Sequence, residues 1–89
     1  MVEAEIEIVN RLGLHARAAA KLVHTANRFE SDIRVARDGE KVDAKSILGI
    51  LLLAAAQGST IRVTCEGSDE AEALIAIPEL VAERFGEER

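Results

Sequence analysis

Gly13-Leu14-His15-Ala16-Arg17 is the stretch that decides the fold, because it joins a strand pattern to a helix pattern. Upstream, the apolar members of residues 2–8 alternate with glutamates, which is the period of a strand with one buried face. Downstream, small and apolar side chains recur at helical spacing over residues 19–26. His15 is therefore expected at, or just before, the N-terminus of a helix.

The position of His15 suits an anion. A helix N-terminus offers unpaired backbone N–H groups and the positive end of the helix dipole. Arg17 adds a planar cation that suits phosphate oxygens. A neutral imidazole beside such a pocket could accept a phosphoryl group covalently. The residues alone fit equally well a solvated histidine that caps the helix beside an ordinary surface arginine.

The composition limits the chain to one small domain, residues 1–89, near the smallest size that buries a self-sufficient core. Phe29 and Phe85 are the only aromatic residues, so neither a base-stacking platform nor an aromatic sugar site is expected. The net charge of −5 argues against nucleic acid or an anionic membrane as a partner.

Cysteine usage and hydropathy predict the compartment. Cys65 is the only cysteine, which excludes an internal disulfide and fits a reducing environment. The N-terminus lacks the basic and apolar pattern of an export signal. The longest apolar run, residues 47–56, is too short to span a bilayer. We therefore expect a cytoplasmic protein that does not insert into membranes.

The remaining patterns predict the order of elements. Strands are expected over residues 2–8, 33–36, 40–42 and 61–66, and helices over residues 16–28, 46–55 and 68–84. This βαββαβα order predicts an α+β open-faced β-sandwich, a four-stranded antiparallel sheet with three helices on one face. Within the last strand, the inward parity of Cys65 predicts a buried small hydrophobe rather than a reactive thiol.

Turn and cap residues predict where these elements begin and end. Asp38-Gly39 indicates a tight hairpin. Ser46 is expected to cap the second helix by accepting a hydrogen bond from the N–H of Leu48 or Gly49, and Gly58 is expected to close its other end.

The last helix carries two further signals. Asp69 and Glu72 have the spacing of a capping box at its start. Pro78 lies inside the helical pattern, where it removes a backbone donor and crowds the carbonyl of Leu74. We therefore expect a kink there, or two short helices instead of one.

Other chemistries find no support in the residue pattern. On a helical wheel His24 falls opposite the buried stripe of Ala19, Leu22 and Ala26, so it cannot join His15 in a metal site. No glycine-rich nucleotide loop is present. We expect neither a metal nor another cofactor.

The second helix predicts a docking surface. It is apolar nearly all round, and one helix packed on one sheet face cannot bury all of that surface. The alternative is a short helix sunk in the core. Beside it, Ala16 and Ala20 are small enough for a partner to approach closely. The predicted docking residues are Ala16, Ala20, Ile47, Leu48 and Leu51.

Gly-Leu-His-Ala-Arg at 13–17, together with Lys-Ser-Ile-Leu-Gly at 45–49, resembles the HPr family of histidine-containing phosphocarriers of the bacterial sugar phosphotransferase system. The likeness covers essentially the whole chain and implies the same architecture. It implies that His15 receives phosphate from phosphorylated enzyme I, itself charged by phosphoenolpyruvate, and passes it to IIA domains of sugar permeases. The chain would then be a carrier, not an enzyme.

The resemblance also implies roles for individual residues. Arg17 and the backbone amides of Ala16, Arg17 and Ala18 would hold the phosphate, although the family usually has proline where this chain has Ala18. Ser46 matches the serine that a dedicated HPr kinase phosphorylates in many members. We expect a monomer. Two alternatives stay open: an HPr-fold regulatory or nitrogen-branch phosphocarrier, and a ferredoxin-like sensor of small ligands.

Overall fold

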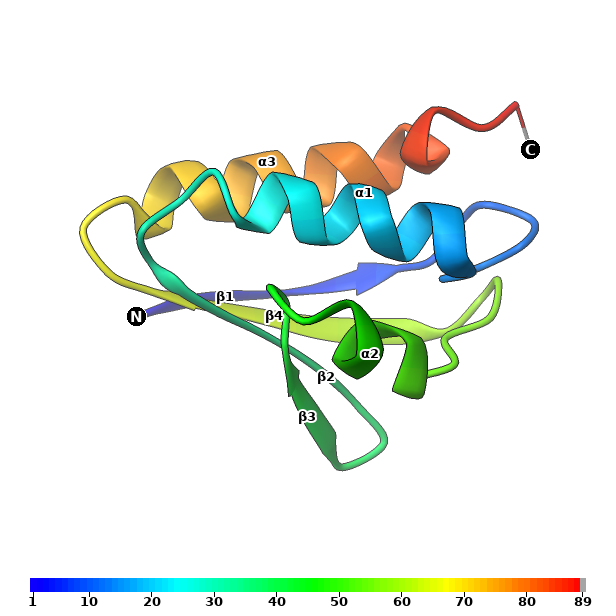
Figure 1. Ribbon diagram of the computed structural model, residues 1–89, viewed down its shortest axis with the longest axis horizontal. Helices are drawn as coiled ribbons and strands as arrows, with labels where there is room; N and C mark the ends of the chain where they lie inside the picture. The colour runs from blue at the N-terminus through cyan, green and yellow to red at the C-terminus, as the bar shows by residue number, and fades with distance from the viewer. Residues whose placement is uncertain (89) are drawn as a thin grey trace.

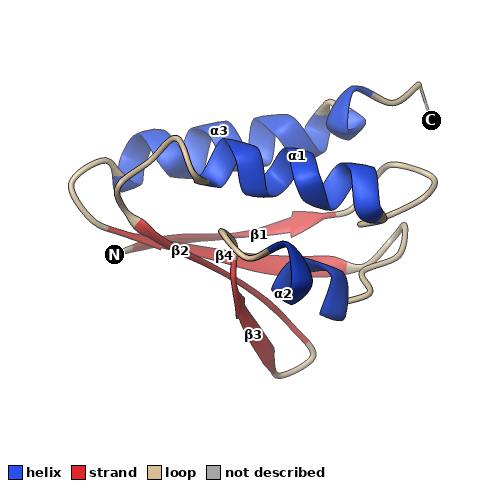
Figure 2. Ribbon diagram, viewed as in Figure 1, coloured by secondary structure: helices blue, strands red, loops and turns tan. Residues whose placement is uncertain are grey.

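Four antiparallel strands form one sheet in the order β1-β4-β2-β3, and the helices cover one of its faces (Figures 1 and 2). The computed structural model describes residues 1–88. In chain order its elements are β1 (Val2–Glu7), α1 (Ala16–Ala26), β2 (Asp32–Arg37), β3 (Glu40–Asp43), α2 (Ile47–Leu52), β4 (Thr60–Glu66), α3 (Glu70–Ala82) and the 3₁₀ turn η1 (Arg84–Gly86). The predicted element order and the α+β open-faced sandwich are confirmed.

Alternation along the strands separates the two faces of the sheet. In β4, Ile61, Val63 and Cys65 are buried, while Arg62 between them is exposed and Thr64 is half-buried. Val63 lies opposite Val35 of β2, so the buried rows of neighbouring strands meet under the helices. Burial raises the pKa of the Cys65 thiol. The prediction of a buried small hydrophobe at this position is confirmed.

Helices α1 and α3 lie side by side above the sheet, and α2 packs against α1 and β3 (Figure 2). The predicted stripe of Ala19, Leu22 and Ala26 is buried, and His24 is exposed, as expected. The core is aliphatic apart from Cys65 and Phe85, and η1 places the Phe85 side chain against it. No helix within residues 1–88 is long and apolar enough to cross a membrane.

Helix α2 ends earlier than predicted. The expected helix through Ala55, closed by Gly58, is wrong, because α2 stops at Leu52 and Ala54 takes a φ of +50°. The carbonyl of Ala55 instead accepts a hydrogen bond from the N–H of Leu14 at 2.8 Å. The N–H of Gly58 likewise donates to the carbonyl of Ile8 at 2.8 Å. Pairing with the segments around β1 therefore replaces the last helical turn.

The capping box predicted at the start of α3 is also wrong. Asp69 occupies the N-cap position but makes no side-chain capping bond. Its carboxylate accepts hydrogen bonds from the backbone N–H groups of Glu30 and Ser31, each at 2.9 Å, and from the Ser31 hydroxyl. Glu70 contributes a local contact instead, because it accepts from the N–H of Gly67 at 3.2 Å. Asp69 thus joins α3 to the loop before β2.

Pro78 does not divide the last helix. Of the two expected outcomes, the split into short helices is wrong, because α3 runs without interruption from Glu70 to Ala82. Ala73, Ile77 and Val81 are all buried on the side of the sheet, so packing holds the helix together on both sides of the proline. After the helix, Arg84 and Phe85 have φ values of +56° and +54°, so the backbone leaves the helical direction within η1.

Candidate functional site

His15 is the N-cap of α1. Its backbone is extended, with φ −75° and ψ 177°, and Ala16 is the first helical residue. The imidazole is partly exposed, and its Nδ1 accepts a hydrogen bond from the N–H of Arg17 at 3.3 Å. An atom that accepts this N–H carries a lone pair directed at the helix N-terminus. The predicted position of His15 is confirmed.

The loop at Gly13 and Leu14 fixes the position of His15. Gly13 has a φ of +65°, and a Cβ at this residue would lie 2.5 Å from the carbonyl oxygen of Ala55. The N–H of Leu14 donates to that same oxygen at 2.8 Å, and the Leu14 side chain is buried. Only glycine allows this close approach. The loop before His15 is therefore fixed to the segment that follows α2.

The first turn of α1 presents backbone donors beside the imidazole. Ala19 is the residue whose N–H returns to the carbonyl of His15, at 2.8 Å. The N–H groups of Ala16, Arg17 and Ala18 precede it, in the part of a helix that has no internal acceptors. The Arg17 side chain is exposed, whereas Ala18 is buried. The imidazole and the first-turn amides therefore lie at the same end of α1, where the helix dipole favours an anion.

Two residues of the site were not predicted from the sequence. Glu87, just after η1, contacts Nε2 of His15 through its Oε2. Its other oxygen, Oε1, accepts a hydrogen bond from Nδ2 of Asn10 at 2.9 Å. The hydrogen bond from Asn10 and, more weakly, the contact with His15 hold the pKa of Glu87 below its ordinary value, against the opposing effect of partial desolvation. A carboxylate therefore faces the side of the imidazole that points away from the helix.

Ser46 lies at the start of α2 and is exposed. Its Oγ accepts a hydrogen bond from the N–H of Gly49 at 3.2 Å, so the predicted cap is confirmed with Gly49 rather than Leu48 as the donor. Lys45 is held nearby through a bond from its Nζ to the carbonyl of Phe29 at 2.8 Å. The serine hydroxyl is thus fixed in place but reachable from solvent.

The apolar side chains of α2 are divided between the core and solvent. Ile50 and Leu53 are buried, while Leu48 is 71% exposed and Leu52 is 78% exposed. The alternative of a helix sunk in the core is therefore wrong. The predicted docking residues are all exposed, and Leu12, in the loop before His15, is exposed with them although the sequence did not single it out. We call the set Ala16, Ala20, Ile47, Leu48, Leu51, Leu52 and Leu12 the apolar patch.

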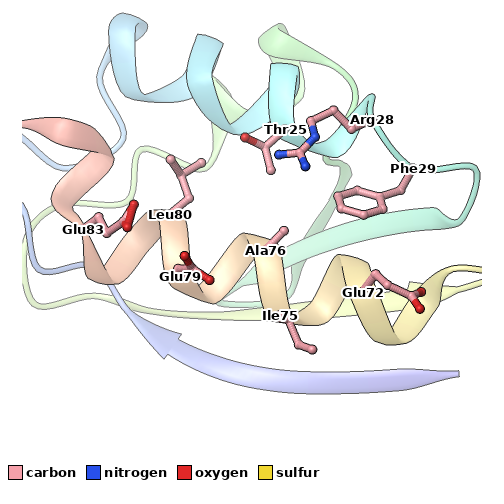
Figure 3. Close-up of a pocket in the computed structure, with 9 residues that line it drawn as sticks. All are labelled: Thr25, Arg28, Phe29, Glu72, Ile75, Ala76, Glu79, Leu80 and Glu83. Carbon is pink, nitrogen blue, oxygen red and sulfur yellow. The ribbon is translucent and has the colours of Figure 1, made fainter.

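A separate groove lies between the C-terminal part of α1 and helix α3, and its lining residues include Phe29, Ile75, Glu79 and Leu80 (Figure 3). Its volume is about 540 Å³. From this part of the chain the groove takes Thr25, in the last turn of α1, and Arg28 and Phe29, which follow the helix. These residues lie at the opposite end of α1 from His15. The groove is therefore not part of the histidine site.

Comparisons with known proteins agree with this geometry. A family model described as the PTS HPr component phosphorylation site matches residues 2–83. The phosphocarrier protein HPr of Cupriavidus necator is 49% identical over 87 residues, which cover 98% of each chain. The crystal structure of HPr-C-His from Thermoanaerobacter tengcongensis is similar with a TM-score of 0.96, 49% identity and complete coverage of both chains. An HPr dimer from the same organism matches with a TM-score of 0.79, 49% identity and coverage of 98% and 100%.

Proposed function

Because the chain belongs to the HPr family and is a phosphocarrier of the phosphotransferase system, we propose that His15 carries its phosphoryl group and that Nδ1 is the bonded atom. The observation that carries this proposal is the hydrogen bond from the N–H of Arg17 to Nδ1 at 3.3 Å. It directs the Nδ1 lone pair to the end of α1 that favours an anion. Nε2 is occupied by Glu87 and does not face those donors.

The phosphate needs charge stabilisation that the first turn of α1 supplies. The phosphoryl oxygens take hydrogen bonds from the backbone N–H groups of Ala16, Arg17 and Ala18, and the Arg17 guanidinium lies over their outer side. The exposure of Arg17 supports this role, because its side chain is free to follow an anion on the imidazole. The chain supplies the acceptor atom and the oxyanion donors, while the partner proteins supply the catalytic groups.

The partners are phosphorylated enzyme I as donor and IIA domains of sugar permeases as acceptors. The apolar patch supports this part of the proposal, because it flanks the phosphate site from both α1 and α2. Small side chains at Ala16 and Ala20 let a partner's own phosphorylated group reach His15. The chain acts as a monomer, which leaves the patch open for one partner after another.

Ser46 is the regulatory phosphosite in this scheme, and a serine kinase specific for HPr is the additional partner. Its exposed hydroxyl stands next to Ile47 and Leu48 of the patch. A phosphate there would place a dianion beside an apolar docking surface, and desolvating that charge would oppose docking. The effect would fall on partner binding rather than on the chemistry at His15.

The test is incubation with phosphoenolpyruvate and enzyme I, followed by intact-mass measurement at alkaline and acidic pH. We expect one phosphate, stable in alkali and lost in acid, as for a phosphorus–nitrogen bond. The His24→Ala variant is the matched control and should be phosphorylated normally, whereas His15→Ala should not. Phosphorylation of His15→Ala would refute the assignment. Onward transfer to sugar-permease IIA domains, compared with IIA domains of a nitrogen branch, tests which branch the carrier serves.

A further inference from the structure

The C-terminal segment lies at the same end of the molecule as the start of α1 (Figure 1), and its Glu87 places a carboxylate at the histidine site. Glu87 is 72 residues from His15 along the chain, yet its Oε2 contacts Nε2 of the imidazole. The side chains are 14% exposed for Glu87 and 27% exposed for His15, so the contact is partly shielded from water. Partial burial makes such a contact stronger than an ion pair on an open surface.

Asn10 holds this carboxylate in place through a hydrogen bond. Its side chain is completely buried, and its Nδ2 donates to the carbonyl of Gly13 at 2.8 Å and to Oε1 of Glu87 at 2.9 Å. An amide nitrogen has two hydrogens, so both are used. Rotating the amide by half a turn would bring its oxygen against two other oxygens. The orientation of Asn10 is therefore determined, and it fixes Glu87 relative to the loop that carries His15.

The carboxylate decides where the imidazole holds its proton. An ionised carboxylate only accepts hydrogen bonds, so the contact with Glu87 requires a proton on Nε2. In the neutral ring the lone pair is then on Nδ1, where the N–H of Arg17 meets it. We propose that Asn10 and Glu87 form a positioning pair, which holds the Nε2 proton of His15 and stabilises the phosphorylated imidazole. The stabilising role rests on the proposed function, whereas the hold on the Nε2 proton does not.

Transfer of the phosphoryl group to His15 needs no proton to leave the imidazole. The Nδ1 lone pair forms the bond to phosphorus, the bond between phosphorus and the donor breaks, and that electron pair leaves with the donor. The ring, still protonated on Nε2, gains positive charge. Glu87 faces that charge directly, because its Oε2 contacts the protonated Nε2. Loss of the carboxylate should therefore weaken the phosphorylated form more than the free form.

The first test uses the unphosphorylated protein and does not depend on the proposed function. Proton NMR of the ¹⁵N-labelled wild-type protein should show a downfield Nε2–H resonance of His15 that exchanges slowly with water. In Glu87→Ala that resonance should be lost to exchange, whereas Glu87→Gln, which keeps an acceptor, should retain it with a smaller downfield shift. Glu87 lies after the last helix and outside the hydrophobic core, so both variants keep the core packing. A wild-type spectrum without the resonance, or an unchanged resonance in Glu87→Ala, would overturn the inference.

The second test measures the phosphoryl-transfer equilibrium with enzyme I. Glu87→Ala should lower the equilibrium constant for phosphorylation of His15 by about three- to tenfold, which corresponds to the net contribution of one hydrogen bond that stays partly exposed to solvent. Glu83→Gln is the control, because it removes an exposed carboxylate from the same end of the chain without touching His15. Equal constants in wild type and Glu87→Ala would overturn the stabilising role. Absence of phosphate on wild-type His15 would instead contradict the proposed function and leave the first test intact.

Discussion

The loop before His15 should be sensitive to a single methyl group at Gly13. A Cβ there would lie 2.5 Å from the carbonyl oxygen of Ala55 and 2.9 Å from the Cα of Ala56, both of which are backbone atoms. Neither can swing away as a flexible side chain would. The Gly13→Ala protein must therefore separate the loop from the segment after α2 and lose the hydrogen bond from Leu14 to Ala55.

The magnitude follows from two contributions. The positive φ of +65° costs an L-residue about 1–2 kcal/mol. The separated backbone leaves the N–H of the buried Leu14 without its acceptor, which costs about 1–3 kcal/mol more. Gly58→Ala isolates the first contribution, because Gly58 has a φ of +89° and open space where its Cβ would be.

Urea unfolding of both variants measures the difference. Gly13→Ala should lose about 1–3 kcal/mol more free energy of unfolding than Gly58→Ala. For a domain of this size each 1 kcal/mol corresponds to about 4–8 °C in Tm, so thermal melts should separate the two proteins clearly. Equal losses, within about 0.5 kcal/mol, would refute the argument that the loop is pinned by this close contact.

Three further substitutions probe the start of α1, the start of α2 and the contact between Asp69 and the loop before β2. Ala18→Pro, which restores the usual family residue, should keep the fold, because the N–H that proline lacks has no helical acceptor in the first turn. It should raise the free energy of unfolding by about 0.4–1 kcal/mol. A lower Tm would show that the proline ring does not fit at this buried position. Ser46→Asp should raise the KM for enzyme I with little change in kcat, while the uncharged cap Ser46→Asn should not, and equal KM values would remove α2 from the interface. The hydrogen bond from Ser31 lowers the pKa of Asp69 below 3.8, so its stabilising effect is present above that pH and is lost as the pH falls through the folded value. Tm measured from pH 7 to pH 2 should therefore fall less steeply in Asp69→Asn than in wild type, and parallel curves would contradict this.

The sequence predicted the elements that rest on long, regular patterns. The alternation before Gly13 and the helical spacing after His15 each extend over several residues, so strand, helix and the cap position of His15 could be read directly. The exposed side of α2 was predictable for a similar reason, because a helix that is apolar all round has more apolar surface than one contact can cover.

The errors arose where distant backbone groups compete for the same atoms. The end of α2 was misplaced because the carbonyl of Ala55 accepts from Leu14, and no local pattern marks that bond. The capping box failed because the Asp69 carboxylate accepts from the loop at Glu30 and Ser31, nearly 40 residues earlier, at separations of 39 and 38. In both cases the local sequence pattern favoured the predicted structure, but a tertiary hydrogen bond formed in its place.

Glu87 was missed for a different reason. It belongs to no periodic segment, and it stands in a run of charged residues at the end of the chain, where a single glutamate has no distinguishing feature. Asn10 follows an alternating strand and resembles an ordinary turn residue. Only the fold brings both to His15, so side chains that tune a site from the far end of a chain lie beyond the reach of pattern analysis.

We propose that Nδ1 of His15 carries the phosphoryl group, and this bond can be observed directly. The most direct measurement is nitrogen–phosphorus coupling by NMR in the ¹⁵N-labelled protein, phosphorylated with phosphoenolpyruvate and enzyme I at alkaline pH. We expect a one-bond coupling between phosphorus and Nδ1 of His15, with Nε2 still bonded to its proton. A one-bond coupling to Nε2 of His15, or to either ring nitrogen of His24, would contradict it.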